Sequence, residues 1–593
     1  ASDEEGDGPE VPDREPLTSD EEALESLMLR AQHYINAGDL RKAFRIFGAA
    51  PMADARLRAT QLALLDLTPY EPLPSAECMA DKPGTAPFTL KAATCDKVIP
   101  HLPRGRAVGT CLTSYELISA TYEAGAREGW ILFFTVFCRG ALADDLADLQ
   151  CALRAVMLCK DDTCTNLRPL GIGEAERRCG CALFCSQKKK GWNDTIYTCQ
   201  LPADKEARDE CVTAATTKVV TAEASCALAA GRGQREIHNA AQVLARARSD
   251  LDEALQPPNI PIQCCFAPNG AELVAHTLEG WAALAPEDDF ISCDTRSMYN
   301  ESKRTPMFDA LHEHDPESKP IYRMIYGRTA AIHVERGPDG LMVELSAAEL
   351  GSRAERCGIV TELPDGETMV DPDAATLNAA GAELPEHISR HAVSLAENPS
   401  VLTIIYAIVV LSFNGTHQGC ALATHGACLP YHIKLHEVQL RHPSVRMIVY
   451  GDDTTAHGPG KRLYGRRSGG QLPWREDKEQ SCAPLGHVAR HDKELCWSPT
   501  SDLAHAPADL AGSPRHPGGR LGGFKIVGCY FGERDWRRRQ LATKVVARLS
   551  PLDAIDQMTD IGDVENSRQI RMALTTHCAA GLPVHWLRCQ RPS

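Results

Sequence analysis

Three acidic residues occupy positions from which they could hold a metal ion together. Asp452 and Asp453 are adjacent and follow an apolar run that ends in Tyr450 and Gly451. The third, Asp294, follows a stretch in which apolar and polar residues alternate. Adjacent carboxylates repel each other, and a divalent cation between them relieves that repulsion. The pattern indicates a metal-dependent site, although an adjacent acid pair after glycine is also typical of an ordinary surface turn.

An acid on one strand and an acid pair on a later hairpin form the ligand layout of two-metal phosphoryl transfer. In such sites two Mg²⁺ ions held roughly 3.5–4 Å apart activate an attacking hydroxyl and stabilise the leaving oxygen. Mg²⁺ takes a few carboxylate oxygens and fills its other positions with water and substrate phosphates. We therefore predict that Asp294, Asp452 and Asp453 are catalytic and that they ligate two Mg²⁺ ions.

The elements that would position these acids can be predicted from local patterns. Residues 289–293 and 446–450 are rich in β-branched and aromatic residues, which favours strands. Gly451 permits a tight hairpin turn with the acids at its tip. Residues 422–440 predict a helix and residues 201–256 predict long helices, whereas the Gly/Pro/Arg-rich residues 458–523 predict irregular structure. We expect an α+β protein in which an antiparallel sheet brings the acids together.

Four segments, in order, resemble the signatures of reverse transcriptases, and most closely the polymerase domain of non-LTR retroelements. Residues 167–178, with Arg168-Pro169 and Glu174, are similar to the family's Arg-Pro-Ile-x-x-x-Glu signature. Asp294 resembles its first catalytic acid, and residues 450–453 resemble its Tyr-x-Asp-Asp box. Residues 415–422 resemble its Gly-x-x-Gln-Gly-x-Pro-Leu segment. The resemblance extends over residues 75–590, with one long interruption.

The resemblance implies a right-hand polymerase with fingers, a palm built on an antiparallel sheet and a thumb, here preceded by a helical extension. The predicted organisation is an acidic disordered tail over 1–18, a helical-hairpin extension over 19–75, fingers and an N-terminal helical region over 76–260, a palm over 261–535 that is interrupted at about 335–400, and a partial thumb over 536–593.

The resemblance also implies roles for residues around the acids. Arg168 would hold template backbone or triphosphate, because arginine grips phosphate with two parallel hydrogen bonds. Tyr299 would stack under the incoming sugar and exclude a ribose 2′-hydroxyl. The remaining implied residues are Gln418, Gly419 and Tyr450 for substrate binding, and Gly528 and Gly532 for a primer grip. Arg168 could instead be an ordinary surface residue, and Tyr299 could simply be half-buried at the end of a strand.

Several residues depart from the family pattern. Residues 263–272 resemble the family's Gln-x-Gly-x-x-x-Gly-x-Glu loop, but Cys265 stands where glycine is usual. Ala421 replaces the proline of the predicted substrate loop. Cys420 replaces a residue that is usually polar or acidic. Lys493 belongs to a segment that only loosely resembles the family's Lys-Cys-x-Leu-Trp strand, and it could protonate leaving pyrophosphate. These departures place the activity of the predicted site in doubt.

Charge and cysteine content limit the possible functions less than the motifs do. The formal net charge of −16 is unusual for a nucleic-acid enzyme. Residues 1–30 hold 11 acidic and 2 basic residues, whereas residues 461–550 hold 17 basic and 9 acidic ones. The negative net charge therefore averages over an acidic N-terminal tail and a basic region near the C-terminus. The 24 cysteines are read as reduced thiols of an intracellular protein, nuclear or organellar, although Cys179, Cys181 and Cys185 could bind zinc. The longest apolar run, residues 401–413, is too short to span a bilayer, so no membrane association is expected.

Two functions remain open from the sequence. The first is an RNA-directed DNA polymerase that acts on an RNA template and a DNA primer. The second is a domesticated, catalytically silent reverse-transcriptase-like protein that binds structural RNA or protein in a ribonucleoprotein such as an organellar ribosome. Residues 19–50 or 335–400 would supply a protein-binding surface in either case.

Overall fold

The computed structural model describes most of the chain between residues 72 and 543. The chain divides into two compact units, residues 51–536 and residues 1–50 with 537–593, and the elements below belong to the first. The described residues are 53, 72–109, 111, 113–159, 167–198, 202–230, 233–255, 261–328, 330–334, 359–362, 368–372, 409–412, 414–417, 419–465 and 472–543.

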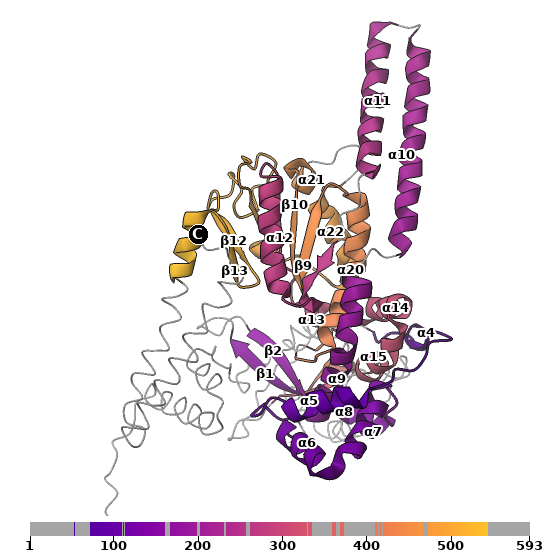
Figure 1. The fold of residues 1–593 in the computed structure, drawn as a ribbon, viewed down its shortest axis with the longest axis vertical. Helices are drawn as coiled ribbons and strands as arrows, with labels where there is room; N and C mark the ends of the chain where they lie inside the picture. Colours follow the sequence, from indigo (N-terminus) through magenta and orange to yellow (C-terminus); the bar gives the residue numbers. More distant parts are fainter. Residues whose placement is uncertain are drawn as a thin grey trace, which may run out of the picture. The chain divides into compact units, whose positions relative to one another are not determined.

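A five-stranded sheet carries the predicted acids (Figure 1). Its order is β11-β4-β10-β9-β3, and all neighbours are antiparallel except β3 and β9, which are parallel. The predicted α+β class and the predicted antiparallel hairpin are therefore confirmed. The strands are β3 (Ile262–Gln263), β4 (Asp289–Cys293), β9 (Arg446–Tyr450), β10 (Asp453–Gly458) and β11 (Leu495–Trp497).

Both faces of this sheet are buried, which explains its long apolar runs. Side chains alternate across a strand, and Phe290 packs in one hydrophobic cluster while its neighbour Ile291 packs in another. The first cluster includes residues of α12 (Gly270–Leu284) and of the hairpin formed by β12 (Gly523–Ile526) and β13 (Cys529–Gly532). The second includes residues of α20 (Ala423–Arg441), the predicted helix. The sheet is thus fixed from both sides.

A second sheet has the order β2-β1-β5-β8. Strands β1 and β5 are parallel, and the other two pairings are antiparallel. Its strands are β1 (Leu153–Cys159), β2 (Leu167–Gly173), β5 (Ala330–Val334) and β8 (Val409–Ser412). Nine further α-helices of the described residues precede the β9–β10 hairpin, apart from the two long helices of residues 202–255. They are α4 (Ala76–Met79), α5 (Ala92–Val98), α6 (Tyr115–Thr121), α7 (Arg127–Cys138), α8 (Asp144–Cys151), α9 (Ala175–Trp192), α13 (Met298–Glu301), α14 (Arg304–His314) and α15 (Lys319–Tyr326).

Two long helices, α10 (Pro202–Ala229) and α11 (Gln234–Leu255), confirm the helical prediction for residues 201–256. They pack against each other as an antiparallel pair, which we call the helical arm (Figure 1). Its buried cluster consists of Val219, Ala222 and Ala247, with Leu244 and Leu251 partly buried against it. Because these side chains are mostly small, the arm buries little apolar surface of its own.

The prediction of irregular structure over residues 458–523 is wrong in part. The region contains α21 (Gly460–Tyr464), α22 (Trp474–Cys482) and strand β11. Trp474 is completely buried, and its indole N–H points to the sulfur of Met447 in β9. Tertiary packing has therefore overridden a composition that is rich in turn residues.

The remaining organisational predictions fall largely outside the described residues. These are the tail over 1–18, most of the extension over 19–75 and most of the residues after 543. Of the predicted insertion at 335–400, the structure describes the antiparallel strands β6 (Ile359–Glu362) and β7 (Thr368–Pro372). No described helix is both long and apolar enough to cross a membrane. The cysteines that the structure describes are all free thiols.

Candidate functional site

Three neighbouring strands end in a row of charged residues. Antiparallel pairing sets Thr454 of β10 opposite Cys293 of β4, so the next residues, Asp453 and Asp294, lie beside each other. On the other side of β4, Leu495 of β11 pairs with Ser292. The same register, extended two residues, places Lys493 next to Asp294. The order across the sheet edge is therefore Lys493, Asp294, Asp453.

The third acid sits in the turn that joins β9 to β10. Tyr450 pairs with Asp453, so Gly451 and Asp452 form a two-residue hairpin turn. Gly451 has a φ of 68°, in the left-handed region where a side chain would be strained. A tight hairpin of this kind requires glycine at this position. The sequence thus places Asp452 and Asp453 next to each other and next to Asp294.

The charges in this row influence one another. Burial raises the pKa of Asp453 to about 6, and the negative charges of Asp452 and Asp294 add to the rise. Lys493 and Lys525 oppose it. Lys493 Nζ lies 2.7 Å from Asp294 Oδ2, with 52% of the lysine side chain and 17% of the aspartate side chain exposed. The three carboxylates therefore form one electrostatic group with an ammonium at its edge.

This group fits Mg²⁺ in the chemistry of its donors, since hard carboxylate oxygens are the ligands that Mg²⁺ prefers. A cation would also remove the repulsion that raises the pKa of Asp453. The ligand atoms are not gathered to the spacing of a filled site. Among the described residues, the group whose three ligand atoms lie within 4.8 Å of one another is a different one, Cys111, Glu174 and Glu176.

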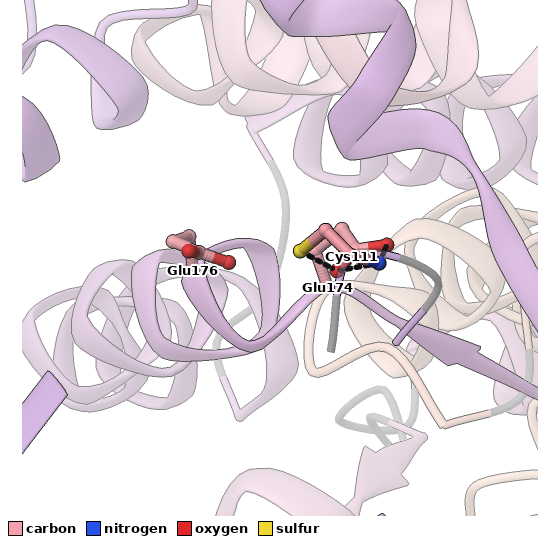
Figure 2. A group of neighbouring side chains, drawn as sticks. All are labelled: Cys111, Glu174 and Glu176. Carbon is pink, nitrogen blue, oxygen red and sulfur yellow. Dashed lines mark hydrogen bonds between the residues drawn. The ribbon is translucent and has the colours of Figure 1, made fainter. Parts of the chain in front are cut away.

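The Cys111 group is explained by local structure (Figure 2). Cys111 N–H donates to Glu174 Oε1 at 3.1 Å, and the Cys111 thiol donates to the same carboxylate. Glu174 is completely buried at the start of α9, with Glu176 on the first turn of that helix. Burial and Glu174 raise the pKa of the Cys111 thiol, so it stays protonated. A protonated thiol is a hydrogen-bond donor and a poor metal ligand. Sequence patterns gave no sign of this contact.

Tyr299 lies close to the β9–β10 turn of Gly451 and Asp452, which we call the acid turn. It is half-buried in α13, and its hydroxyl lies 3.5 Å from Thr424 Oγ1 of α20. A Cβ atom added to Gly451 would lie 4.0 Å from the same hydroxyl. Burial raises the pKa of Tyr299, with a contribution from Asp452. Tyr450, in contrast, packs with its ring against Gly270 at the start of α12.

The predicted substrate loop is described in part, since Gln418 lies outside the described residues. Gly419 has a φ of 107°, and an added Cβ would approach the backbone oxygen of Gly171 in β2 to 3.1 Å. Arg304 anchors the start of this loop, and its guanidinium donates to carbonyl oxygens that include those of Gly415 and Asn414. Arg304 is fully buried, and burial lowers its pKa to about 10.

The remaining predicted contact residues stay predictions. Arg168 lies in β2 opposite Leu158. Gly528 occupies the turn between β12 and β13 with a φ of 82°. At Gly532 an added Cβ would lie 2.3 Å from the Cα of Gly523, so the two hairpin strands require glycine there. Cys179 and Cys181, which could have bound zinc, are buried thiols, and burial raises the pKa of both.

The sequence did not single out Gln263 as part of the site. This residue is completely buried in β3, and its side-chain amide binds both backbone groups of Gly451. The only available signal was its place in a segment that resembles a family loop. The ion pair between Lys493 and Asp294 similarly depends on the position of β11. Glu494, which directly precedes β11, forms a 2.6 Å ion pair with Arg475.

Comparisons with known proteins leave the family open. No protein-family model matches the chain. No curated protein matches it. Among solved structures, it is similar to telomerase from Candida albicans, solved in complex with the TWJ fragment of telomeric RNA, at 8% identity and a TM-score of 0.27. The match covers 79% of this chain and 59% of the telomerase chain, so this chain spans less than two thirds of that protein. A TM-score this low carries no argument about fold or activity.

Proposed function

We propose that the chain is an RNA-directed DNA polymerase that extends a DNA primer by two-metal phosphoryl transfer. The supporting observation is the register of the five-stranded sheet, which sets Asp294 beside Asp453 with Asp452 in the adjoining turn. Acids brought together from separate strands repel one another, and a bound cation would relieve that repulsion. The order of the sequence signatures adds independent support.

In this proposal Asp294, Asp452 and Asp453 hold two Mg²⁺ ions. When bound, these ions supply Lewis-acid activation of the primer hydroxyl and charge neutralisation of the phosphates. The residues of the chain do the rest. Lys493, whose ammonium lies 2.7 Å from Asp294, would donate a proton to leaving pyrophosphate. Tyr299, half-buried beside the acid turn, limits the space at the sugar.

Primer extension on an RNA template with deoxynucleotides and Mg²⁺ tests this proposal. We expect Asp452→Asn and Asp294→Asn each to reduce extension by about 10³-fold or more, since each removes ligand charge. The matched control is Asp492→Asn. Asp492 is an exposed acid that pairs with Arg490 outside the row, so its variant should retain the wild-type rate. Normal extension by the Asp452 variant would overturn the proposal.

A second function is favoured by the Lys493–Asp294 ion pair, because an acid already neutralised by the chain's own cation needs no metal. In this alternative the protein binds structural RNA in a nuclear or organellar ribonucleoprotein and has no polymerase activity. Purified protein that fails to extend any primer with Mg²⁺ or Mn²⁺, and that retains RNA through purification, would support it.

A further inference from the structure

The buried side chain of Gln263 forms hydrogen bonds with both backbone groups of Gly451, the first residue of the acid turn. Gly451 N–H donates to Gln263 Oε1 at 2.8 Å, and Gln263 Nε2 donates to the Gly451 carbonyl oxygen at 3.2 Å. Cys428 Sγ lies 3.9 Å from the same carbonyl oxygen. Turn residues normally satisfy their backbone with water. Here Gly451 is buried, so its groups depend on Gln263.

Gln263 is itself held rigidly. It is completely buried, and β3 runs parallel to β9 with Gln263 opposite Val449. Its Oε1 also accepts from Cys265 N–H at 3.4 Å, at the start of the short helix that follows. The backbone of Gln263 is held by strand pairing and its side-chain amide by Cys265, so the amide cannot follow the turn if the turn moves. It therefore limits where the turn can lie.

We infer that Gln263 is a positioning residue that fixes the β9–β10 turn and thereby the carboxylates of Asp452 and Asp453. Gly451 directly precedes Asp452, so rotation about the Gly451 backbone would move that carboxylate first. Loss of the amide would leave the buried Gly451 N–H unsatisfied and its carbonyl oxygen with only the 3.9 Å contact to Cys428 Sγ, and the turn would shift to reach water. The consequence for metal binding rests on the proposed function, whereas the fixing of the turn does not.

A matched control lies near the start of β9, the strand whose end leads into the acid turn. Gln439 is 3% exposed, and its side-chain amide donates to the carbonyl oxygens of His442 and Val445, just before β9. Gln263→Met and Gln439→Met make the same chemical change to two buried, backbone-binding amides. Only the first faces the acid turn.

Hydrogen–deuterium exchange tests the fixing of the turn. In Gln263→Met the amides of residues 450–453 should exchange at least about 10-fold faster than in wild type, whereas Gln439→Met should accelerate only the segment around 442–446. Should Gln263→Met not fold, the wild type still decides, because its Gly451 amide should exchange at least about 10-fold slower than that of Gly528 in the β12–β13 turn. Equal exchange in either comparison overturns the inference.

Binding of Mn²⁺ alone, followed by electron paramagnetic resonance, tests the consequence. We expect Gln263→Met to weaken Mn²⁺ binding by about 10-fold or more and Gln439→Met to leave it within about 2-fold. Equal losses in the two variants would mean that Gln263 acts only through general stability. If wild-type protein binds no Mn²⁺ and extends no primer, the proposed function fails, and the exchange experiment still decides the role of Gln263.

Discussion

Asp453 is the residue at which the electrostatics of the sheet edge can be measured. Its pKa is raised to about 6 by burial and by two neighbouring carboxylates. The sequence pointed to Asp452 and Asp453 because adjacent aspartates after a glycine are a visible pattern, and to Asp294 because it follows an alternating strand pattern. It could not identify Gln263 as a partner of Gly451, since the contact joins residues 188 positions apart and depends on a parallel strand pairing.

Stability should depend on pH through Asp453. Between about pH 4 and pH 6 the folded protein binds this proton more tightly than the unfolded chain does. The free energy of unfolding should therefore fall by roughly 1–3 kcal/mol as the pH rises through this window, and remain at its lower value above it. Urea denaturation of wild type and Asp453→Asn across the window measures the contribution, which the variant lacks. A variant with the same pH dependence as wild type would contradict the assigned pKa.

Replacing Lys493 tests whether its ammonium competes with metal. Lys493→Met leaves Asp294 without its cation, so Mn²⁺ affinity should rise by about 2–5-fold, which corresponds to the 0.5–1 kcal/mol of a partly exposed ion pair. Isothermal titration measures the change. Arg490→Met is the control, because Arg490 pairs with Asp492 instead. Weaker Mn²⁺ binding in Lys493→Met would show that the lysine supports the metal site.

At the scale of elements, buried charge connects helices that are distant in sequence. Asp315, which is 5% exposed after α14, accepts from Lys188 Nζ at 2.8 Å and from Trp192 Nε1 at 2.7 Å, both in α9. His425 Nε2 of α20 lies 3.3 Å from the same carboxylate. Sequence patterns predicted α20 well but not this cluster, because burial of this aspartate depends on three residues from two helices that are distant in sequence.

Removing the charge of Asp315 should therefore destabilise the protein strongly. Asp315→Asn leaves Lys188 partly buried without its buried acid partner, and we expect the free energy of unfolding to fall by about 2–4 kcal/mol. Glu317→Gln is the control. Glu317 binds the same Lys188 Nζ at 2.8 Å but is 40% exposed, so its loss should cost about 1 kcal/mol or less. Equal losses in urea denaturation would contradict the importance of the buried partner.

At the scale of the whole molecule, buried apolar surface is distributed unevenly among the described residues of the first unit. The acid-bearing sheet is buried on both faces, whereas the helical arm has a small, alanine-rich seam and exposes Val220 and Leu228. The helical pattern of residues 201–256 was readable because it is local. The strand order of the sheets was not, since parallel pairings such as β1 with β5 join segments separated by long stretches of chain.

We expect the helical arm to open well before the rest of the first unit. Hydrogen–deuterium exchange should show amides of α10 and α11 exchanging at least about 10-fold faster than those of α20, which is buried along most of its length. Val219→Leu should slow exchange in the arm by filling its seam. Arm amides as protected as those of α20 would contradict this expectation.

The row of Lys493, Asp294 and Asp453 depends on the register in which β11, β4 and β10 pair. Side chains alternate between faces, so a slip of one residue would turn every side chain of a strand to the opposite face. Deleting a single residue within β10 would therefore carry Asp453 away from Asp294 even though every charged residue were still present. The site should accordingly tolerate many conservative substitutions within these strands and almost no insertion or deletion, a distinction that a deletion scan of residues 454–457 would reveal.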